Sequence, residues 1–356
     1  MTLLALETSC DETSAAVVRD GQVLANVVSS QIKLHQEYGG VVPELAAREH
    51  LKNLLPVAYA ALREAGIVTA ETWNARHAPV ALDAVAATQG PGLAIALLIG
   101  FKAAQAVAFA LNKPFIGINH HEAHLYSPWI QAGTTPGARL SAAFSEFQPN
   151  VSLIVSGGHT MLVLVESELK HRVLGGTIDD AAGECFDKTG KLMGLAYPAG
   201  PIIDRLAAEG NPEAYDFPRP LLHDANDDFS FSGLKTSVRY FIRDHPELLD
   251  DPKKIRDLCA SVQAAIVEVL VKKTIRAAKR EGVRCITASG GVTCNSGLRR
   301  ELERACKRHG FALRLAEKSL CTDNAAMIGI LAERKLQAKA ALPPLDAEVN
   351  PGWALA

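Results

Sequence analysis

The residues best suited to chemistry form a short histidine cluster, His120-His121-Glu122-Ala123-His124. His120 and His124 are four positions apart, so on a helix their imidazoles share one face and can bind one metal ion. His121 points elsewhere on such a helix. The apolar segment 115–118 just before the cluster is typical of a strand, and sites in α/β folds collect where strands end. The spacing predicts a metal site, with a pair of core or solvated histidines as the alternative.

A third metal ligand must come from elsewhere in the chain. Asp323, at the predicted start of the last helix, is the best carboxylate, although an acid at that position is also explained by the helix dipole. The zinc-protease motif HExxH is absent, because His121 and His124 flank Glu122 with one residue too few to share a helix face. We therefore expect a His–His–carboxylate site and not a protease.

Three turns of small or polar residues lie next to predicted strands. Ser156-Gly157-Gly158 lies between two strands and can present backbone N–H groups to a phosphate, because glycine permits close approach. Ser289-Gly290-Gly291 leads from a strand into a helix, where a phosphate is also favoured. The turn at residues 8–13 offers hydroxyls and carboxylates, which suit a phosphate and a cation together. Each turn has a structural alternative, a tight hairpin, but their joint occurrence favours a nucleotide held between two lobes.

Several familiar motifs are missing from the sequence. There is no GxxxxGK[ST] P-loop and no strand-linked GxGxxG, so P-loop and Rossmann interpretations are excluded. The nucleophile motif GxSxG is also missing. These observations leave a phosphate-binding, metal-assisted enzyme of another fold.

Two lobes are expected to position these residues, because 356 residues exceed what one hydrophobic core usually serves. Hairpins with small polar turns at residues 3–18 and 151–165 indicate a duplicated α/β architecture. Helices are expected at 44–66, 93–111, 255–281, 298–308 and from 323 onward, and further strands at 83–87, 115–118 and 284–288. The predicted organisation is a first lobe at 1–135 joined by the C-terminal helix at 322–342, a second lobe at 136–321, a tail at 343–356 and a polar loop at 131–150.

Composition indicates a soluble, cytosolic protein. Apolar residues make up 48% of the chain, and the net charge of −2 gives no global attraction to nucleic acid or anionic lipid. Seven cysteines without a CxxC pair indicate reduced thiols in the cytosol. The N-terminus lacks the basic segment of a signal peptide. The apolar stretch at 93–111 contains Lys102 and Gln105, which favours a buried helix over a membrane span.

Together these segments resemble the universal family of enzymes that form threonylcarbamoyladenosine in tRNA, and the likeness covers nearly the whole chain. The motifs that carry it are LETSCDETS at 6–14, SSQIKLHQEYGGVVPELAAREH at 29–50, TQGPGLAIALLIG at 88–100, NHHEAH at 119–124, LIVSGGHT at 153–160, DDAAGECFDKTGKLMGL at 179–195, FSFSGLKT at 229–236, SGGVTCN at 289–295 and CTDNAAM at 321–327. Their number and common order make chance similarity negligible. One departure is Ala199, where most members have glycine.

The resemblance implies an α/β fold of the actin-like ATPase type, a duplicated ribonuclease H-like architecture with two lobes. It implies a transferase that moves the threonylcarbamoyl group from threonylcarbamoyl-AMP to the exocyclic amine of the adenosine beside the anticodon, in tRNAs reading codons that begin with A. It also implies partners, namely tRNA, a paralogous actin-like subunit and a small ATPase of the bacterial TsaB and TsaE type, and no membrane.

The resemblance also assigns roles to residues. The implied metal ligands are His120, His124 and Asp323, holding one divalent ion per subunit, Fe²⁺ first and Zn²⁺ second. The implied contacts to the adenine nucleotide, threonylcarbamoyl-AMP or ATP, are Ile154, Val155, Ser156, Gly157, Gly158, Asp187, Gly200, Asp204 and Asn295. Glu12 is the candidate catalytic residue, orienting the metal's water shell or the incoming amine.

Three rival interpretations remain. An actin-fold small-molecule kinase would use a catalytic aspartate and has no use for the histidine pair. A metal-dependent hydrolase shares the metal site. A chaperone-like ATPase needs a substrate-binding β domain, for which the chain has no room.

Because the net charge is negative, tRNA would have to meet local basic patches. Two predicted helices supply candidates for phosphate contacts, although either set is also explained as an ordinary solvated helix face. The candidates are Lys272, Lys273, Arg276, Lys279 and Arg280 on the first helix, and Arg299, Arg300, Arg304, Lys307 and Arg308 on the second.

Overall fold

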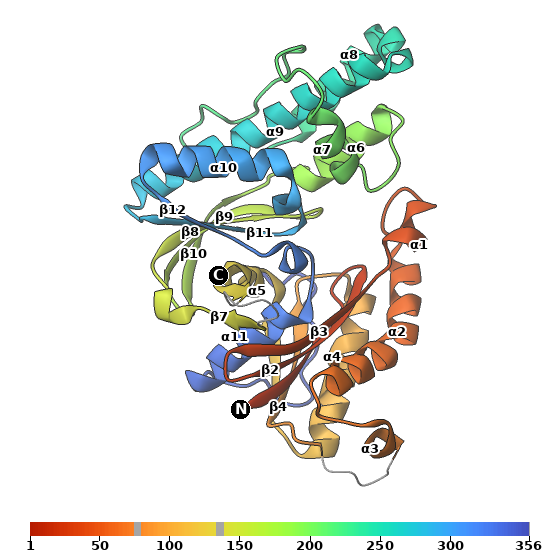
Figure 1. The fold of residues 1–356 in the computed structure, drawn as a ribbon, viewed down its shortest axis with the longest axis vertical. Coiled ribbons are helices and arrows are strands. Elements are labelled where there is room, and N and C mark those ends of the chain that lie inside the picture. Colours follow the sequence, from red (N-terminus) through yellow and green to blue (C-terminus); the bar gives the residue numbers. More distant parts are fainter. Residues whose placement is uncertain (75–79, 133–138, 356) are drawn as a thin grey trace. The chain divides into compact units, whose positions relative to one another are not determined.

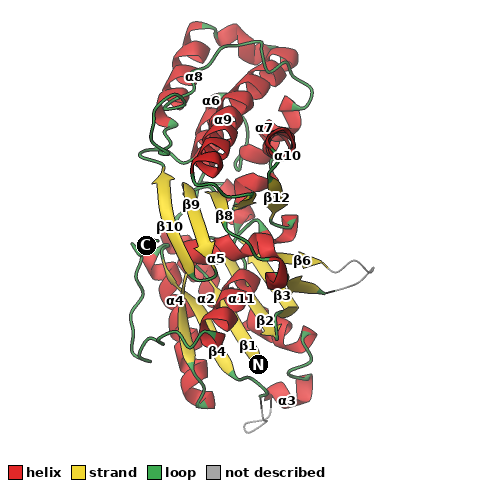
Figure 2. Ribbon diagram, turned by 90° about the vertical axis from the view of Figure 1, so that its left-hand side faces the viewer, coloured by secondary structure: helices red, strands yellow, loops and turns green. Residues whose placement is uncertain are grey.

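The computed structural model describes residues 1–74, 80–132 and 139–355. The chain divides into two compact units, each built around its own mixed β-sheet (Figures 1 and 2). Unit 1 comprises Met1–Glu146 and Asp323–Leu355, and unit 2 comprises Phe147–Thr322.

The sheet of unit 1 has seven strands in the order β5-β4-β1-β2-β3-β7-β6. The strands are β1 Thr2–Glu7, β2 Glu12–Arg19, β3 Gln22–Ser30, β4 Ala84–Gly90, β5 Phe115–Asn119, β6 Ile130–Ala132 and β7 Leu140–Ala142. β2 pairs antiparallel with both β1 and β3, whereas β4 pairs in parallel with β1 and β5 pairs in parallel with β4. The strands expected at 3–6, 15–18, 83–87 and 115–118 are therefore confirmed.

Helices cover both faces of this sheet. They are α1 Ile32–Gln36, α2 Pro43–Glu64, α3 Ala70–Asn74, α4 Ala94–Leu111, α5 His120–Tyr126 and α11 Ala325–Gln337. Leu4 and Leu6 of β1 join the core that α2 and α4 complete, while Ala5, between them, faces α11, as expected from the alternation along a strand. Gly329 of α11 lies so close that a Cβ atom there would be 2.7 Å from Val18 Cγ2, so α11 can pack tightly on the sheet.

α4 is, among the described residues, the one helix long and apolar enough to cross a membrane. It packs against β4 and α2. It contributes Phe101, Ala104 and Ala108 to the core of unit 1. The helix expected at 93–111 is thus present, with one face in the core.

The segment at 131–150 contains more structure than the predicted polar loop. β6 and β7 pair antiparallel, and the N–H of Ala142 donates to the carbonyl of Gly21 beside β3. The free edge of β3 has backbone groups to satisfy, so tertiary pairing overrides the polar composition of the segment. Residues 133–138 of the segment lie outside the described residues. With this hairpin, unit 1 extends to Glu146 and not to residue 135.

The C-terminal residues 343–355 also belong to unit 1. The N–H of Asn350 donates to the Gln89 carbonyl at 2.8 Å, and the Gln89 amide donates to the Glu348 carbonyl at 2.8 Å. Gly90 is close enough that a Cβ there would lie 1.8 Å from the Asn350 oxygen. The glycine after Gln89 therefore lets this segment pack on the end of β4.

Unit 2 has a five-stranded sheet in the order β10-β9-β8-β11-β12. The strands are β8 Asn150–Val155, β9 Thr160–Ser167, β10 Lys170–Gly176, β11 Cys285–Ser289 and β12 Ala312–Leu315. The helices are α6 Ala182–Leu192, α7 Gly200–Ala207, α8 Ser232–Asp244, α9 Pro252–Arg280 and α10 Ser296–His309. The expected strands and helices after residue 150 are present within a few residues of their predicted ends.

The two sheets share one topology. In each, three consecutive antiparallel strands are followed by two parallel strands on the other side of the first, so that β3-β2-β1-β4-β5 corresponds to β10-β9-β8-β11-β12. The duplication expected from the two hairpins is therefore present in the strand order.

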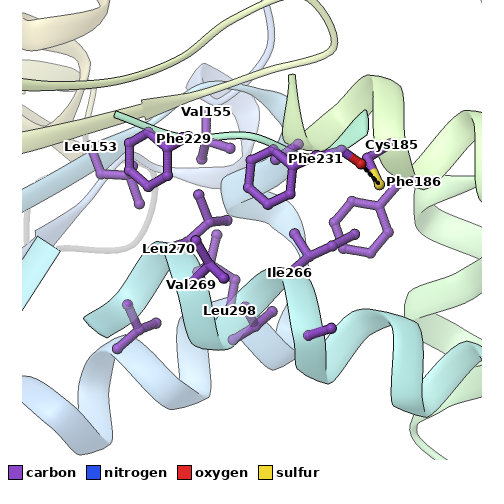
Figure 3. Close-up of a cluster of buried hydrophobic side chains, with 14 of the residues drawn as sticks. Leu153, Val155, Cys185, Phe186, Phe229, Phe231, Ile266, Val269, Leu270 and Leu298 are labelled. Atoms are coloured by element: carbon purple, nitrogen blue, oxygen red, sulfur yellow. Dashed lines mark hydrogen bonds between the residues drawn. The ribbon is translucent and has the colours of Figure 1, made fainter. Parts of the chain in front are cut away.

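The core of unit 2 forms where α9 packs under its sheet (Figure 3). Leu153 and Val155 of β8 lie beside Phe229, and Ile266 and Leu270 of α9 belong to the same cluster. This core fixes the end of β8, where the predicted phosphate-binding turn begins.

Candidate metal centre and substrate-binding loops

The histidine cluster forms a helix because Asn119 caps it. Asn119 ends β5 with extended dihedral angles, and its side-chain oxygen accepts a hydrogen bond from the Glu122 N–H at 3.1 Å. Such a cap satisfies a backbone donor that the first helical turn leaves free. All residues of α5 are buried, and the rings of His120 and His124 have centroids 4.8 Å apart.

Asp323 meets both histidines although it is distant in sequence. Its Oδ1 lies 3.3 Å from Nε2 of His120 and 3.3 Å from Nε2 of His124. The potential ligand atoms of the three residues all lie within 4.8 Å of one another. α11 begins at Ala325 behind the cap Asn324, so Asp323 precedes the helix and is not one of its first-turn acids. Unit 1 thus brings the three predicted ligands together.

Glu7, at the end of β1, holds the other nitrogen of His120. Its Oε2 lies 3.0 Å from His120 Nδ1, and its side chain is completely buried. A carboxylate oxygen accepts, so His120 Nδ1 carries a proton towards Glu7, and Nε2, on the side of Asp323, is the nitrogen that could bind a metal ion. A carboxylate behind a ligating histidine is the usual arrangement at protein metal sites.

The electrostatics of this cluster favour a positive charge. Burial lowers the pKa of His120, but the Asp323 and Glu7 carboxylates outweigh burial and hold that pKa well above its ordinary value. Burial raises the pKa of Asp323, but His120 and His124 outweigh it and hold that pKa well below its ordinary value. Two histidine nitrogens and a carboxylate oxygen that converge in this way fit a divalent metal ion, and the donor set suits iron or zinc.

Glu12 is the first residue of β2 and belongs to the predicted turn at residues 8–13. It is 8% exposed and accepts a hydrogen bond from the Ser30 hydroxyl at 3.3 Å. Burial, followed by the charges of Asp11 and Asp323, raises the pKa of Glu12 well above its ordinary value. Glu12 therefore shares the electrostatic environment of Asp323.

His50 of α2 anchors the same turn, a residue that sequence reasoning did not single out. Its Nε2 donates to the Cys10 carbonyl at 2.9 Å, so its Nδ1 accepts from the Thr13 hydroxyl at 2.8 Å. The Gln31 amide also donates to Nδ1 at 3.3 Å. Burial is the main reason why the pKa of His50 lies below its ordinary value. The neutral imidazole of His50 therefore holds the turn that contains Glu12 in place.

The first predicted phosphate-binding turn follows β8 in unit 2. The Ser156 N–H donates to the His159 carbonyl at 2.8 Å, and the His159 N–H donates to the Ser156 hydroxyl at 3.2 Å. These bonds close a tight turn around Gly157 and Gly158. A Cβ at either glycine would meet no atom within 4 Å. The turn therefore presents bare backbone to open space.

Two other glycines support this turn from behind. A Cβ on Gly183, in α6, would lie 2.5 Å from the Ser156 oxygen. A Cβ on Gly290, whose φ is +92°, would lie 2.3 Å from the Val155 oxygen. The second predicted turn, at 289–291, is therefore packed directly against the end of β8. These glycines are required by packing, unlike Gly157 and Gly158.

The remaining predicted substrate contacts hold loops in unit 2. Asp187 Oδ1 accepts from the N–H groups of Ala199 and Gly200 at 2.7 and 3.3 Å, at the start of α7. Asp204 accepts from the Ser296 N–H and hydroxyl, each at 2.9 Å, at the start of α10. Asn295 caps α10, accepting from the Leu298 N–H at 2.8 Å. In the structure these side chains orient helix starts, and contact with a substrate stays a prediction.

Signals for the missed residues existed in the sequence. Glu7 lies in LETSCDETS, and His50 closes SSQIKLHQEYGGVVPELAAREH, both motifs of the resemblance. Neither Glu7 nor His50 lies at a sequence spacing typical of metal ligands, so their hydrogen-bond partners become apparent only in the folded chain.

Solved structures establish the fold class. A structure of full-length HypF in the phosphate- and nucleotide-bound form matches with a TM-score of 0.57 at 14% identity, over 94% of this chain and 46% of that one. The chain thus spans about half the length of that protein. The activator of 2-hydroxyisocaproyl-CoA dehydratase from Clostridium difficile, with bound ADPNP, matches with a TM-score of 0.50 at 14% identity, over 95% and 97% of the two chains. With the duplicated strand order, these likenesses define an actin-like ATPase fold.

Sequence comparisons establish the family. The family model TsaD, tRNA N6-adenosine threonylcarbamoyltransferase, matches residues 22–330. The tRNA N6-adenosine threonylcarbamoyltransferase of Chloroherpeton thalassium is 51% identical over 346 residues, covering 95% of this chain and 93% of that protein. The enzyme of the same name from Geotalea uraniireducens is 48% identical over 356 residues, covering 100% and 97%. This chain belongs to the tRNA N6-adenosine threonylcarbamoyltransferase family.

Proposed function

We propose that this protein transfers the threonylcarbamoyl group from threonylcarbamoyl-AMP to the exocyclic amine of the adenosine beside the anticodon, in tRNAs that read codons beginning with A. The observation that carries the proposal is the convergence of His120, His124 and Asp323, backed by Glu7, in a chain of this family. The rival kinase is disfavoured because kinases hold their Mg²⁺ through carboxylate and phosphate oxygens and not through a pair of histidines.

In unit 1 the proposed roles concern the metal and the amine. A divalent ion, Fe²⁺ by preference or Zn²⁺, would be held by His120, His124 and Asp323 and would supply a Lewis acid for the phosphate and carbamoyl oxygens. Glu7 keeps His120 in the tautomer whose Nε2 can bind that ion. Glu12, held in place by the turn that His50 anchors, orients the incoming amine.

In unit 2 the proposed roles concern the adenylate. The backbone N–H groups around Gly157 and Gly158 bind its phosphate, because no side chain blocks their approach. Asp187, Asp204 and Asn295 position the neighbouring helix starts. The amine nitrogen then bonds to the carbamoyl carbon, the bond from that carbon to the phosphate oxygen breaks, and the amine loses one proton. AMP leaves with the oxygen.

The family resemblance also supports proposals about context. The protein would act in the cytoplasm, in a complex with a paralogous actin-like subunit and a small ATPase of the TsaB and TsaE type. Those partners would share the binding of tRNA.

The experiment supplies threonylcarbamoyl-AMP labelled in its threonine, the purified full chain with its partner proteins, and unmodified tRNA. Label should appear on a tRNA with adenosine beside the anticodon. A tRNA in which that adenosine is replaced by guanosine, which has a carbonyl at C6 where adenosine has the reacting amine, is the matched control. Absence of label on the first tRNA, or equal labelling of both, would overturn the proposal.

A further inference from the structure

Unit 2 contains a groove bounded by α7, α9 and α10, with a volume of about 1130 Å³. α9 packs against both α7 and α10 (Figures 1 and 2). Seven Lys or Arg residues line the groove against three Glu residues, an excess of four positive charges. The chain as a whole has a net charge of −2. We call this feature the α9–α10 groove.

Six of the seven positive charges come from one face of α9 or one face of α10, and the seventh is Arg219. Residues at i, i+4 and i+7 or i+8 lie along one side of a helix, so each helix presents a row of cations. The rows are Lys272, Arg276 and Lys279 on α9, and Arg300, Arg304 and Arg308 on α10. Like charges at this spacing weaken a helix. Both rows nevertheless line the same groove.

Only part of this charge is neutralised within the protein. Lys272 shares Glu268 with Arg219, and Arg304 pairs with Glu301. Lys279, Arg300 and Arg308 are exposed, and none of them has an acidic partner among the described residues. These three are the cations available to a ligand.

The chemistry of the groove selects the ligand. Guanidinium groups bind phosphate through two parallel hydrogen bonds, and two facing rows of cations suit a chain of phosphates. No Phe, Tyr or Trp side chain is among the described residues that line the groove. Among the described lining residues, the imidazole of His309 is therefore the one ring on which a base could stack. The groove would contact the backbone of a nucleic acid more than its bases.

We propose that the α9–α10 groove binds the phosphate backbone of tRNA, with Lys279, Arg300 and Arg308 as its principal contacts. The proposal rests on the proposed function for the identity of the nucleic acid. It places a tRNA contact in unit 2, on a surface formed by two helices whose basic residues are far apart in sequence.

The test compares a groove variant, Lys279→Gln, Arg300→Gln and Arg308→Gln together, with two controls. One control, Lys113→Gln, Arg239→Gln and Lys253→Gln, removes three exposed cations that do not line the groove. The other, Lys279→Arg, Arg300→Lys and Arg308→Lys, keeps every charge. Binding of unmodified tRNA to each full-length protein is measured from low to moderate salt, and transfer is measured with the partner proteins.

The groove variant should reduce the slope of log affinity against log salt by about 3, close to 1 for each lost phosphate contact. Its KM for tRNA should rise by about tenfold or more in the transfer assay, with kcat little changed. Both controls should keep the wild-type slope, and the control at Lys113, Arg239 and Lys253 should also keep the wild-type KM. If the groove variant keeps the wild-type slope and the wild-type KM for tRNA, the proposal is overturned. A groove that binds an acidic protein instead of tRNA would give this result. If tRNA binding depends on the groove but no transfer is observed, the proposal about the groove stands and only the proposed function is contradicted.

Discussion

The Nδ1 atom of His120 lies 3.0 Å from Oε2 of Glu7, whose side chain is completely buried at the end of β1. The same carboxylate oxygen accepts the Thr88 hydroxyl at 2.6 Å, so Glu7 links two strands of the sheet to the metal centre. The orientation of the first histidine is therefore set by the sheet and not by α5 alone.

Replacing this carboxylate should weaken metal binding without unfolding the protein. In Glu7→Gln the side chain keeps its shape, but His120 loses its charged partner and becomes a weaker ligand. Metal affinity should fall by about 10–100-fold, the usual effect of removing such a partner. Competition with a chelator measures it. Glu333→Gln, which changes a buried carboxylate of α11 that binds the Gly21 N–H, should keep the wild-type affinity; equal affinity in Glu7→Gln would contradict the role.

His50 makes stability depend on pH. Burial holds its folded-state pKa below 6.5, so the unfolded chain binds the proton first on acidification. The contribution of neutral His50 to the free energy of unfolding is therefore present above pH 6.5. It is lost as the pH falls below 6.5, by at most about 1.4 kcal/mol per pH unit. His50→Gln removes the titration, so its stability deficit relative to the wild type should shrink between pH 7.5 and 5.5. Urea denaturation at both values measures the deficit, and a deficit independent of pH would rule this out.

Substitutions at Gly157 and Gly290, in the two predicted phosphate-binding turns, should have different effects: the first on substrate binding, the second on stability. Gly157→Ala meets no neighbour, so its unfolding free energy should match the wild type. Its KM for threonylcarbamoyl-AMP should nevertheless rise about tenfold, corresponding to about 1.4 kcal/mol of lost binding. Gly290→Ala, with φ at +92° and a Cβ contact of 2.3 Å, should lose at least about 2 kcal/mol of stability. An unchanged KM in Gly157→Ala would show that the adenylate does not approach this turn.

Much of this arrangement is predictable from the sequence. Apolar runs located β1, β2, β8 and β9, and two similar hairpins indicated the repeated unit that the strand order confirms. The helical spacing of His120 and His124 correctly placed two imidazoles on one face. Asp323 was selected as the carboxylate at the predicted start of the last helix, and the resemblance then implied the same residue.

Other features depend on contacts that no local pattern encodes. Glu7 reaches His120 because β1 lies beside β4, and β4 lies beside β5. The β6–β7 hairpin forms in a polar segment because the edge of β3 is free to pair. The sequence offered both basic helices as candidates for phosphate contacts, with ordinary solvated faces as the alternative. Only the packing of α9 against α10 brings their charges to one groove.

Glu12 is expected to affect the reaction and not the metal. Its carboxyl is buried near Asp323 but is not one of the three convergent ligands. In Glu12→Ala transfer should fall by on the order of 10²-fold, the lower range for a positioned acid–base group. Metal content, measured by elemental analysis, should stay at the wild-type value. The exposed control Glu37→Ala should retain both, and full activity in Glu12→Ala would remove this residue from the mechanism.

The central claim is that a metal bound by His120, His124 and Asp323 supports threonylcarbamoyl transfer. The most direct measurement follows labelled threonylcarbamoyl-AMP onto unmodified tRNA for the wild type and the His120→Ala, His124→Ala double variant, with metal content determined on the same samples. A His223→Ala, His245→Ala variant, which removes two exposed histidines, is the control. The wild type and the control should contain metal and label tRNA, and the double variant should do neither. Full transfer by a metal-free double variant would contradict the account.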